Sequence, residues 1–253
     1  MDDARNADHR VLVGYRPVVH LATGTVVGWR LGRTRTPSTA RELDEHLREA
    51  VCLMCDTLVA TDRGRASMRF AVIEARLSEA AALADHAAWA MLEYRMPGPR
   101  IGFVFPAADV LGAPDQHVHL RRLALLGVGV GACDPTLEHA EAVLAQRLPI
   151  TRLRLPAPDV DPRSTSGTGA RIVRIINAAR RAGVSVTISG IDSVEQQSAA
   201  RRAGADIGTG AALGAVTELP VLHLPRDHAA LEAVQRLTVA RRVRSASEWA
   251  AAG

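Results

Sequence analysis

The feature that most constrains the fold is an alternation of strand-like and helix-like segments through most of the chain. Short apolar runs at residues 68–73, 101–105, 127–132, 151–155 and 184–189 alternate with longer stretches whose apolar residues recur at helical spacing. Repeated strand–helix units of this size are typical of a parallel sheet covered by helices. About eight strands in roughly 220 residues favour a closed (β/α)8 barrel over an open sheet.

The beginning of the chain departs from this alternation. Residues 11–19 and 25–31 have strand composition and surround a short turn that contains Gly24, which predicts a β-hairpin. A regular (β/α)8 chain would have a helix between its first two strands. Residues 40–61 follow with apolar positions at steps of three and four, which predicts a long helix.

The chain is expected to have three parts. Residues 1–10 are polar and are expected to form a flexible N-terminus, and residues 11–220 form the barrel. Residues 221–253 form a C-terminal extension, in which residues 227–243 have the pattern of an extra amphipathic helix.

Composition excludes several classes of protein. No window approaches the roughly 18 uncharged apolar residues of a membrane span, and the first residues do not resemble a signal peptide. The 3 cysteines do not make a disulfide framework. We therefore expect a cytoplasmic protein with reduced thiols and no membrane partner.

Every one of the 31 cationic side chains is arginine, and the net charge is +4. The absence of lysine excludes Schiff-base, lysine-nucleophile and P-loop mechanisms. The 27 acidic residues are interleaved with the arginines, so no polybasic arm stands out. Direct binding of nucleic acid is therefore not expected.

Residues 15–29, YRPVVHLATGTVVGW, resemble the opening of EAL domains, the cyclic di-GMP phosphodiesterases, where the segment is YxPIVDLxTGxVVGFEALLR. Four later segments resemble other motifs of that family in the same order: residues 125–128, 148–155, 172–193 and 204–210. The resemblance implies an α/β fold, a TIM-like barrel of EAL type whose first strand is antiparallel. This would account for the hairpin.

The catalytic residues of the resembled family are not retained. Its members hydrolyse a phosphodiester with metal-activated water held by carboxylates and an asparagine, because divalent cations prefer several converging oxygen ligands. The glutamate of the EAL motif aligns with Arg30, the asparagine with Val72 or Ile73, and the paired aspartates with Cys133 and Asp134. The remaining catalytic positions align with residues of other types: Arg154 for lysine, Ser189 for glutamate and Thr209 for glutamine. The resemblance thus implies no metal and no cofactor.

Two uses of the altered positions stay open. Arg30 and Arg154 would point into the former catalytic mouth, and Arg33 lies close by in sequence. Guanidinium pairs recognise phosphate in a bidentate manner, so the mouth could bind an anionic nucleotide. Alternatively, an ion pair with Asp134 closes the pocket. The candidate ligand-binding positions are Arg30, Arg33, Asp134, Arg154, Ser189 and Thr209.

Two smaller motifs have structural interpretations. Cys52 and Cys55 form a single CxxC inside the predicted helix, which favours buried core thiols over metal or redox chemistry. The alternating glycines of residues 127–131 predict a strand where barrel packing is close.

The function expected from the sequence is that of a catalytically inactive EAL-type domain, a regulatory protein-interaction module in bacterial signalling. The alternative is a receptor that binds cyclic di-GMP or another anionic nucleotide without hydrolysing it. The expected partner is a protein, and a homodimer stays open.

Overall fold

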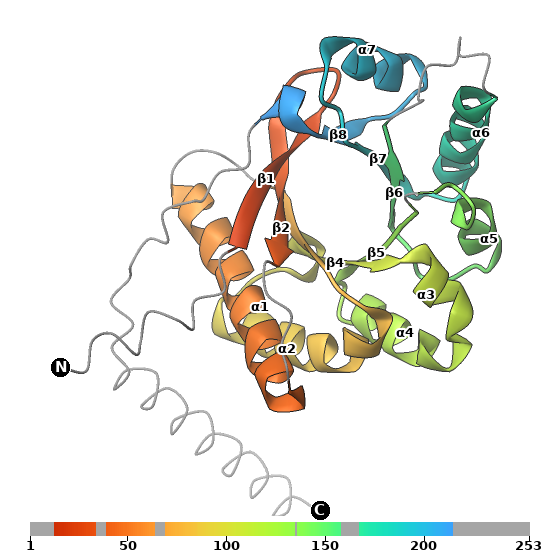
Figure 1. Ribbon diagram of the computed structural model, residues 1–253. Helices are drawn as coiled ribbons and strands as arrows, with labels where there is room; N and C mark the ends of the chain where they lie inside the picture. The colour runs from red at the N-terminus through yellow and green to blue at the C-terminus, as the bar shows by residue number, and fades with distance from the viewer. Residues whose placement is uncertain (1–12, 34–38, 64–68, 135, 158–166, 215–253) are drawn as a thin grey trace, which may run out of the picture. The chain divides into compact units, whose positions relative to one another are not determined.

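Eight strands form a closed barrel in the order β1 to β8 (Figure 1). The computed structural model describes residues 13–33, 39–63, 69–134, 136–157 and 167–214. The strands are β1 (Val13–His20), β2 (Val26–Arg33), β3 (Phe70–Glu74), β4 (Ile101–Pro106), β5 (Gly129–Cys133), β6 (Arg152–Pro156), β7 (Ser185–Ser189) and β8 (Ile207–Thr209). The predicted (β/α)8 barrel is confirmed.

The predicted hairpin is also confirmed, and it makes β1 the antiparallel strand. β1 pairs antiparallel with both β2 and β8, whereas all other neighbouring strands are parallel. Gly24, in the turn, has φ 70°, which glycine adopts without the steric cost of a Cβ. The register places Arg16 of β1 opposite Arg30 of β2.

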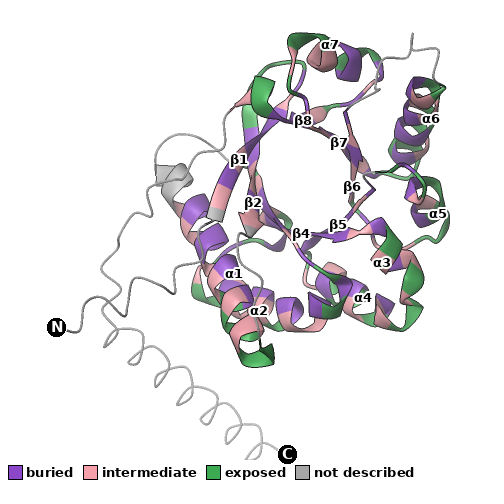
Figure 2. Cartoon of the chain, in the orientation of Figure 1, coloured by how far each residue is buried: buried purple, intermediate pink, exposed green. Residues whose placement is uncertain are grey.

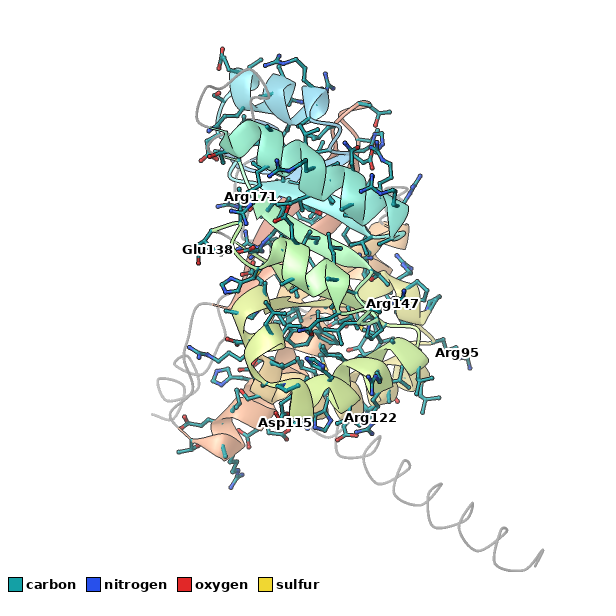
Figure 3. All side chains as sticks on the ribbon, turned by 90° about the vertical axis from the view of Figure 1, so that its right-hand side faces the viewer. Arg95, Asp115, Arg122, Glu138, Arg147 and Arg171 are labelled. Carbon is teal, nitrogen blue, oxygen red and sulfur yellow. The ribbon has the colours of Figure 1, made fainter. Side chains whose placement is uncertain are left out.

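Seven helices surround the barrel in the described part of the chain (Figure 1): α1 (Ala40–Arg63), α2 (Ala80–Glu93), α3 (Ala107–Gly112), α4 (His117–Leu125), α5 (Ala140–Ala145), α6 (Thr168–Arg181) and α7 (Val194–Arg202). The sequence pattern missed α3, because six residues are too few to display a helical period. Charged side chains on the outer helices, such as Arg122 and Arg171, lie at the periphery (Figure 3).

The main apolar core lies between the strands and the helices. Successive side chains of a strand point to opposite faces, and here the outward-facing ones, such as Ile73, Phe103 and Leu153, are fully buried. Figure 2 shows that the strands are largely buried and that the exposed positions lie mainly on the helices. The inward-facing set includes Arg30, Glu74 and other polar residues that are only half-buried. The barrel interior is therefore charged, unlike the branched apolar filling usual in such barrels.

The predicted flexible N-terminus (residues 1–10) and the predicted C-terminal extension (residues 221–253) lie outside the described residues. None of the described helices is long and apolar enough to cross a membrane.

Candidate functional site

The barrel interior is built in layers, because alternate strands contribute side chains at the same height. The strand registers place Arg30, Val104, Arg154 and Thr209, from the even-numbered strands, in one layer. Glu74 and Cys133 stand in the layer nearer the carboxyl ends of the parallel strands. Arg152 precedes Arg154 by two residues on β6, and it therefore stands two layers from the layer of Arg30 and Arg154, towards the amino ends of the parallel strands. Residues separated by more than 100 positions thus converge in one space.

Glu74 joins the two arginines that the sequence singled out. Its Oε1 accepts hydrogen bonds from Nε of Arg30 and from Nη1 of Arg154, and both contacts are also ion pairs. The side chains are 26% exposed for Arg30, 17% for Arg154 and 32% for Glu74, so solvent screens the pairs only in part. One carboxylate from β3 therefore ties β2 to β6 across the barrel.

The charges of this cluster shift one another's pKa values. Burial alone raises the pKa of Glu74, but the hydrogen bonds and charges of Arg154 and Arg30 outweigh it and hold that pKa below its usual value. Burial lowers the pKa of Arg30, and the positive charge of Arg154 adds to this effect. Burial also opposes the charge of Arg154, but Glu74 outweighs it and raises the pKa of Arg154. All three groups are ionised at neutral pH.

Positive charge exceeds negative charge in this part of the barrel. Arg16, opposite Arg30 on β1, is a third guanidinium near the cluster and further lowers the pKa of Arg30. Burial raises the pKa of the Cys133 thiol, which stands beside Arg154 on the next strand and is therefore protonated. Among the residues that the structure describes, the mouth thus presents three cations against the single carboxylate of Glu74.

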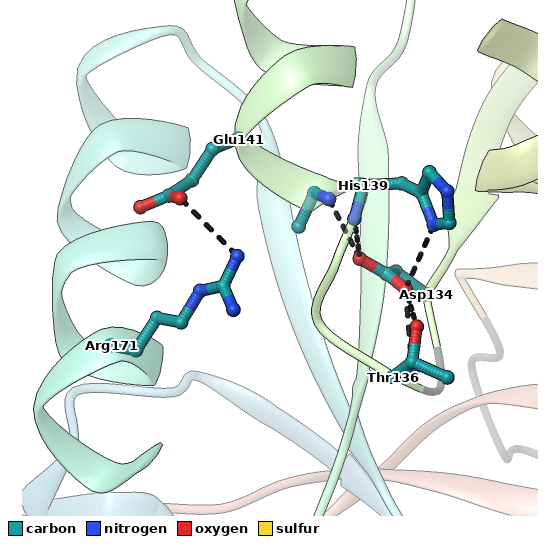
Figure 4. Close-up of polar contacts among 6 residues, drawn as sticks. Asp134, Thr136, His139, Glu141 and Arg171 are labelled. Atoms are coloured by element: carbon teal, nitrogen blue, oxygen red, sulfur yellow. Dashed lines mark hydrogen bonds and ion pairs between the residues drawn. The ribbon is translucent and has the colours of Figure 1, made fainter. Parts of the chain in front are cut away.

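The alternative in which Arg30 and Arg154 pair with Asp134 is wrong, because Asp134 has another role. Asp134 is 1% exposed, and its Oδ2 accepts hydrogen bonds from the backbone N–H groups of His139 and Ala140, both at 2.7 Å (Figure 4). Its Oδ1 accepts from the hydroxyl of Thr136 at 3.1 Å. Asp134 therefore satisfies the unpaired N–H groups at the start of α5.

The other predicted positions differ in their surroundings. Thr209 is buried in the layer of Arg30 and Arg154, and its hydroxyl has no hydrogen-bond partner among the described residues. Ser189 donates its hydroxyl to the carbonyl of Leu155 at 3.1 Å, so it braces neighbouring strands. Arg33 is the last residue of β2, and its side chain lies outside the described part.

A further arginine, Arg152, lies inside the barrel nearer the amino ends of the strands. Its guanidinium carbon is 3.9 Å from the centre of the Phe70 ring. A Cβ at Gly102 would lie 2.7 Å from Arg152 Nη1, and one at Gly129 would lie 3.3 Å from the guanidinium carbon. The glycines of β4 and β5 thus provide the room for Arg152, which confirms the close packing predicted for residues 127–131.

A cavity of about 30 Å³ lies between Arg152 and the pair of Arg30 and Arg154. Its walls are mainly apolar and include Val18, Val72 and Val104. This space suits a particle the size of a water molecule, whereas pockets for small organic ligands measure about 300–1,000 Å³.

The described residues contain no group of three or more His, Cys, Asp or Glu side chains that could hold a metal ion. The CxxC cysteines lie in α1 as predicted, with Cys55 fully buried and Cys52 half-buried. Burial raises the pKa of the Cys55 thiol to about 12.

The sequence interpretation missed Glu74 and Arg152. The sequence could have indicated both. Each lies two residues from a position aligned with a catalytic residue, and residues two apart on a strand point to the same face. Glu74 follows Val72 on β3, and Arg152 precedes Arg154 on β6.

Comparisons with known proteins agree with this architecture. The family model described as "EAL domain" matches residues 35–215. No curated protein matches the chain in sequence. Several solved structures share the fold, at identities that establish the fold alone. The EAL domain of Mycobacterium smegmatis DcpA is 18% identical, with a TM-score of 0.69 over 83% of this chain and 94% of that one.

Two further structures have bound nucleotides in their descriptions. The FimX EAL domain of Xanthomonas citri, in complex with c-diGMP, is 17% identical, with a TM-score of 0.67 over 81% of this chain and 87% of that one. The EAL enzyme Bd1971, in a cGMP-bound form, is 16% identical, with a TM-score of 0.66 over 81% of this chain. The match spans 61% of the length of Bd1971.

Proposed function

The chain belongs to the EAL domain family, and we propose that it is a member without hydrolytic activity that acts as a regulatory protein-interaction module. The observation that carries the proposal is the bridge from Arg30 through Glu74 to Arg154. Two residues of this bridge, Arg30 and Arg154, align with a glutamate and a lysine of the catalytic site in the resembled family. A cluster with more arginines than carboxylates repels divalent cations, because like charges about 4 Å apart repel by several kcal/mol at an effective dielectric near 20.

A second described carboxylate near this end of the barrel, that of Asp134, supports the same proposal. Asp134 could contribute to a metal site only if it gave up its hydrogen bonds to the backbone of α5. A buried donor left without an acceptor costs about 1–3 kcal/mol, so metal binding by Asp134 would be opposed by the start of that helix.

The size of the interior confines any nucleotide to the mouth of the barrel. A cyclic dinucleotide is far larger than a particle that fits about 30 Å³. To reach the barrel interior it would have to displace Glu74 from both arginines. We therefore place the function on the surface of the domain at the mouth of the barrel, and we propose a cytoplasmic protein partner in bacterial signalling.

The test of hydrolysis is a turnover assay of the full chain with cyclic di-GMP in Mg²⁺ and in Mn²⁺, with an active EAL phosphodiesterase as the positive control. We expect no linear or mononucleotide product above the buffer blank. Product that accumulates with time and disappears on addition of a chelator would contradict the proposal.

The test of the partner is affinity capture from cells that express the protein, with quantitative comparison of variants. Arg16→Ala alters the mouth, and Arg121→Ala, on the exposed surface of α4, is the matched control. A partner that binds the mouth is depleted by the first substitution and retained by the second. Recovery of no specific partner would count against a protein-interaction module.

The excess of positive charge favours one alternative, a receptor for an anionic nucleotide at the mouth. In the described part of the chain, Arg16, Arg30 and Arg154 face a single carboxylate, which leaves capacity for a phosphate group. Calorimetry with cyclic di-GMP decides between the two proposals. Micromolar binding that is lost in Arg30→Ala and Arg154→Ala supports the receptor, and no heat of binding removes it.

A further inference from the structure

The barrel has a second end, where its parallel strands begin and most of its helices finish. A helix that connects two parallel strands runs back along the barrel, so α2, α4, α5 and α6 all end at the amino ends of the strands. Four arginines lie in the last two turns of these helices or directly after them: Arg95, Arg121, Arg147 and Arg181. All four are exposed, and none has an ion-pair partner among the described residues. Figure 3 shows Arg95 and Arg147 at the end of the barrel opposite Glu138.

Negative charge is scarce at this end of the barrel. The described loops that lead into the last five strands contain one carboxylate, Asp206, which pairs with Arg180 at 3.6 Å. Glu93, the last residue of α2, adds a second carboxylate. Within the described residues, positive charge therefore exceeds negative charge where these helices end.

Stabilisation of the helix ends does not account for all of these arginines. A cation near a helix C-terminus interacts favourably with the helix dipole. However, Arg95 and Arg147 have φ angles of 50° and 49°, in the left-handed region, where a residue with a Cβ carries a steric cost that exceeds the usual gain from the dipole. Glycine takes the left-handed position after α4, α6 and α7, at Gly127, Gly183 and Gly204. Arginine at the other two positions therefore points to a use outside the fold.

Two leucines at this end of the barrel are exposed over most of their surface. Leu92, one residue before the end of α2, is 82% exposed, and Leu125, the last residue of α4, is 88% exposed. The loops that follow these two helices pack against each other, because a Cβ at Gly98 would lie 2.5 Å from the carbonyl oxygen of Leu126. The leucines thus lie on neighbouring helix ends, and their exposed side chains do not stabilise the isolated domain.

We propose that this end of the barrel binds the surface of a lipid bilayer that contains anionic lipids. The contact residues, which we call the amino-end face, are Arg95, Arg121, Arg147, Arg181, Leu92 and Leu125. The guanidinium groups are complementary to the lipid phosphates, and each arginine close to an anionic membrane strengthens binding about fivefold. The leucine side chains enter the boundary between head groups and acyl chains, as the apolar side chains of interfacial helices do. The inference is independent of the proposed loss of hydrolysis and of the proposed partner at the mouth.

A bilayer fits the amino-end face better than other occupants do. A second copy of the face would bring like charges together, and residues 215–253 contain more arginines than acidic residues, so neither is complementary in charge. Duplex nucleic acid offers phosphates but little apolar surface for the leucines. The charge is spread over the ends of four helices, and its complement is a continuous anionic surface with an apolar layer beneath it. The expectation of no membrane partner rested on the lack of a spanning segment, which a surface contact does not require.

The test is co-sedimentation of the full chain with vesicles of phosphatidylcholine alone and with vesicles that contain about one third phosphatidylglycerol. We expect binding to the anionic vesicles only, and weaker binding as the salt concentration rises, because salt screens the charges. Arg95→Gly combined with Arg147→Gly should weaken the binding about 25-fold without lowering the Tm, because glycine suits both left-handed positions. The matched control, Arg41→Gln combined with Arg174→Gln, removes two exposed arginines from the first halves of α1 and α6 and should weaken it less than about threefold.

The leucines provide a second variant that leaves the charge unaltered. Leu92→Ser combined with Leu125→Ser should weaken binding to the anionic vesicles about tenfold, because the apolar contact is lost. Equal binding by the two arginine variants, or no binding of the unaltered protein to anionic vesicles at low salt, would overturn the proposal. A short DNA duplex and polyglutamate are tested in parallel. Binding of either one without binding of the vesicles would also overturn it, and would assign the face to nucleic acid or to an acidic protein.

Discussion

Replacing Glu74 by glutamine removes the charge that holds Arg30 and Arg154 together but keeps the shape of the side chain. Breaking a fully buried ion pair costs about 3–5 kcal/mol, whereas an exposed pair contributes about 0–1 kcal/mol. The three side chains are 17–32% exposed, which places this cluster between the two limits. We expect Glu74→Gln to lower the free energy of unfolding by about 2–4 kcal/mol, and the Tm by roughly 5–12 °C.

The assay is urea unfolding followed by circular dichroism at pH 7, with Glu45→Gln as the matched control. Glu45 pairs with Arg41 on α1 at 3.0 Å, but the two side chains are 54% and 90% exposed. We expect the control to cost less than about 1 kcal/mol. If Glu74→Gln costs no more than Glu45→Gln, the bridge does not stabilise the barrel and the reasoning is refuted.

The pH dependence of the same pair of proteins gives an independent check. The folded-state pKa of Glu74 is lowered, so its contribution is fully present above the unfolded-state pKa, near 4.3, and is lost as the pH falls through the folded-state value. The difference in stability between the unaltered protein and Glu74→Gln should therefore be constant from pH 6 to 8, and should shrink below about pH 4.5. A difference that grows on acidification would contradict the direction of this shift.

Three further perturbations test other parts of the barrel. Asp134→Ala leaves N–H groups of α5 without an acceptor, and we expect urea unfolding to show a loss of about 1–3 kcal/mol, against little change for the exposed Asp115→Ala. Gly102→Ala places a Cβ 2.7 Å from Arg152 Nη1 and 2.8 Å from Val72 Cγ1, and should cost about 1–3 kcal/mol in the same assay. Gly112→Ala, where nothing lies within 4 Å, should be neutral or slightly stabilising, and an equal effect of both substitutions would refute the packing argument. The pKa of the Cys55 thiol is raised to about 12, so this thiol should not react with a thiol-specific reagent at pH 8 until urea unfolds the chain. If the folded Cys55→Ala variant has one labelled thiol fewer than the folded unaltered protein, Cys55 is accessible and the prediction is contradicted.

The sequence predicted the barrel because the relevant signals are local. Alternation of buried strands with amphipathic helices is visible in short windows, and the Gly24 turn indicated the one antiparallel strand. Short helices were not predicted, because a short segment does not show a helical period. The six residues of α3 follow directly after β4 and do not complete two helical turns.

The sequence also determined which chemistry is present in the chain: all its basic side chains other than histidine are arginines, and they include Arg30 and Arg154. Only the tertiary structure decided how those charges are paired. Asp134 and Glu74 are both carboxylates that follow or end a strand, yet one caps α5 and the other bridges the barrel. The choice depends on strand register, because closure of the barrel lets Glu74 of β3 reach Arg154 of β6 through the interior, whereas Asp134 continues into the start of its own helix.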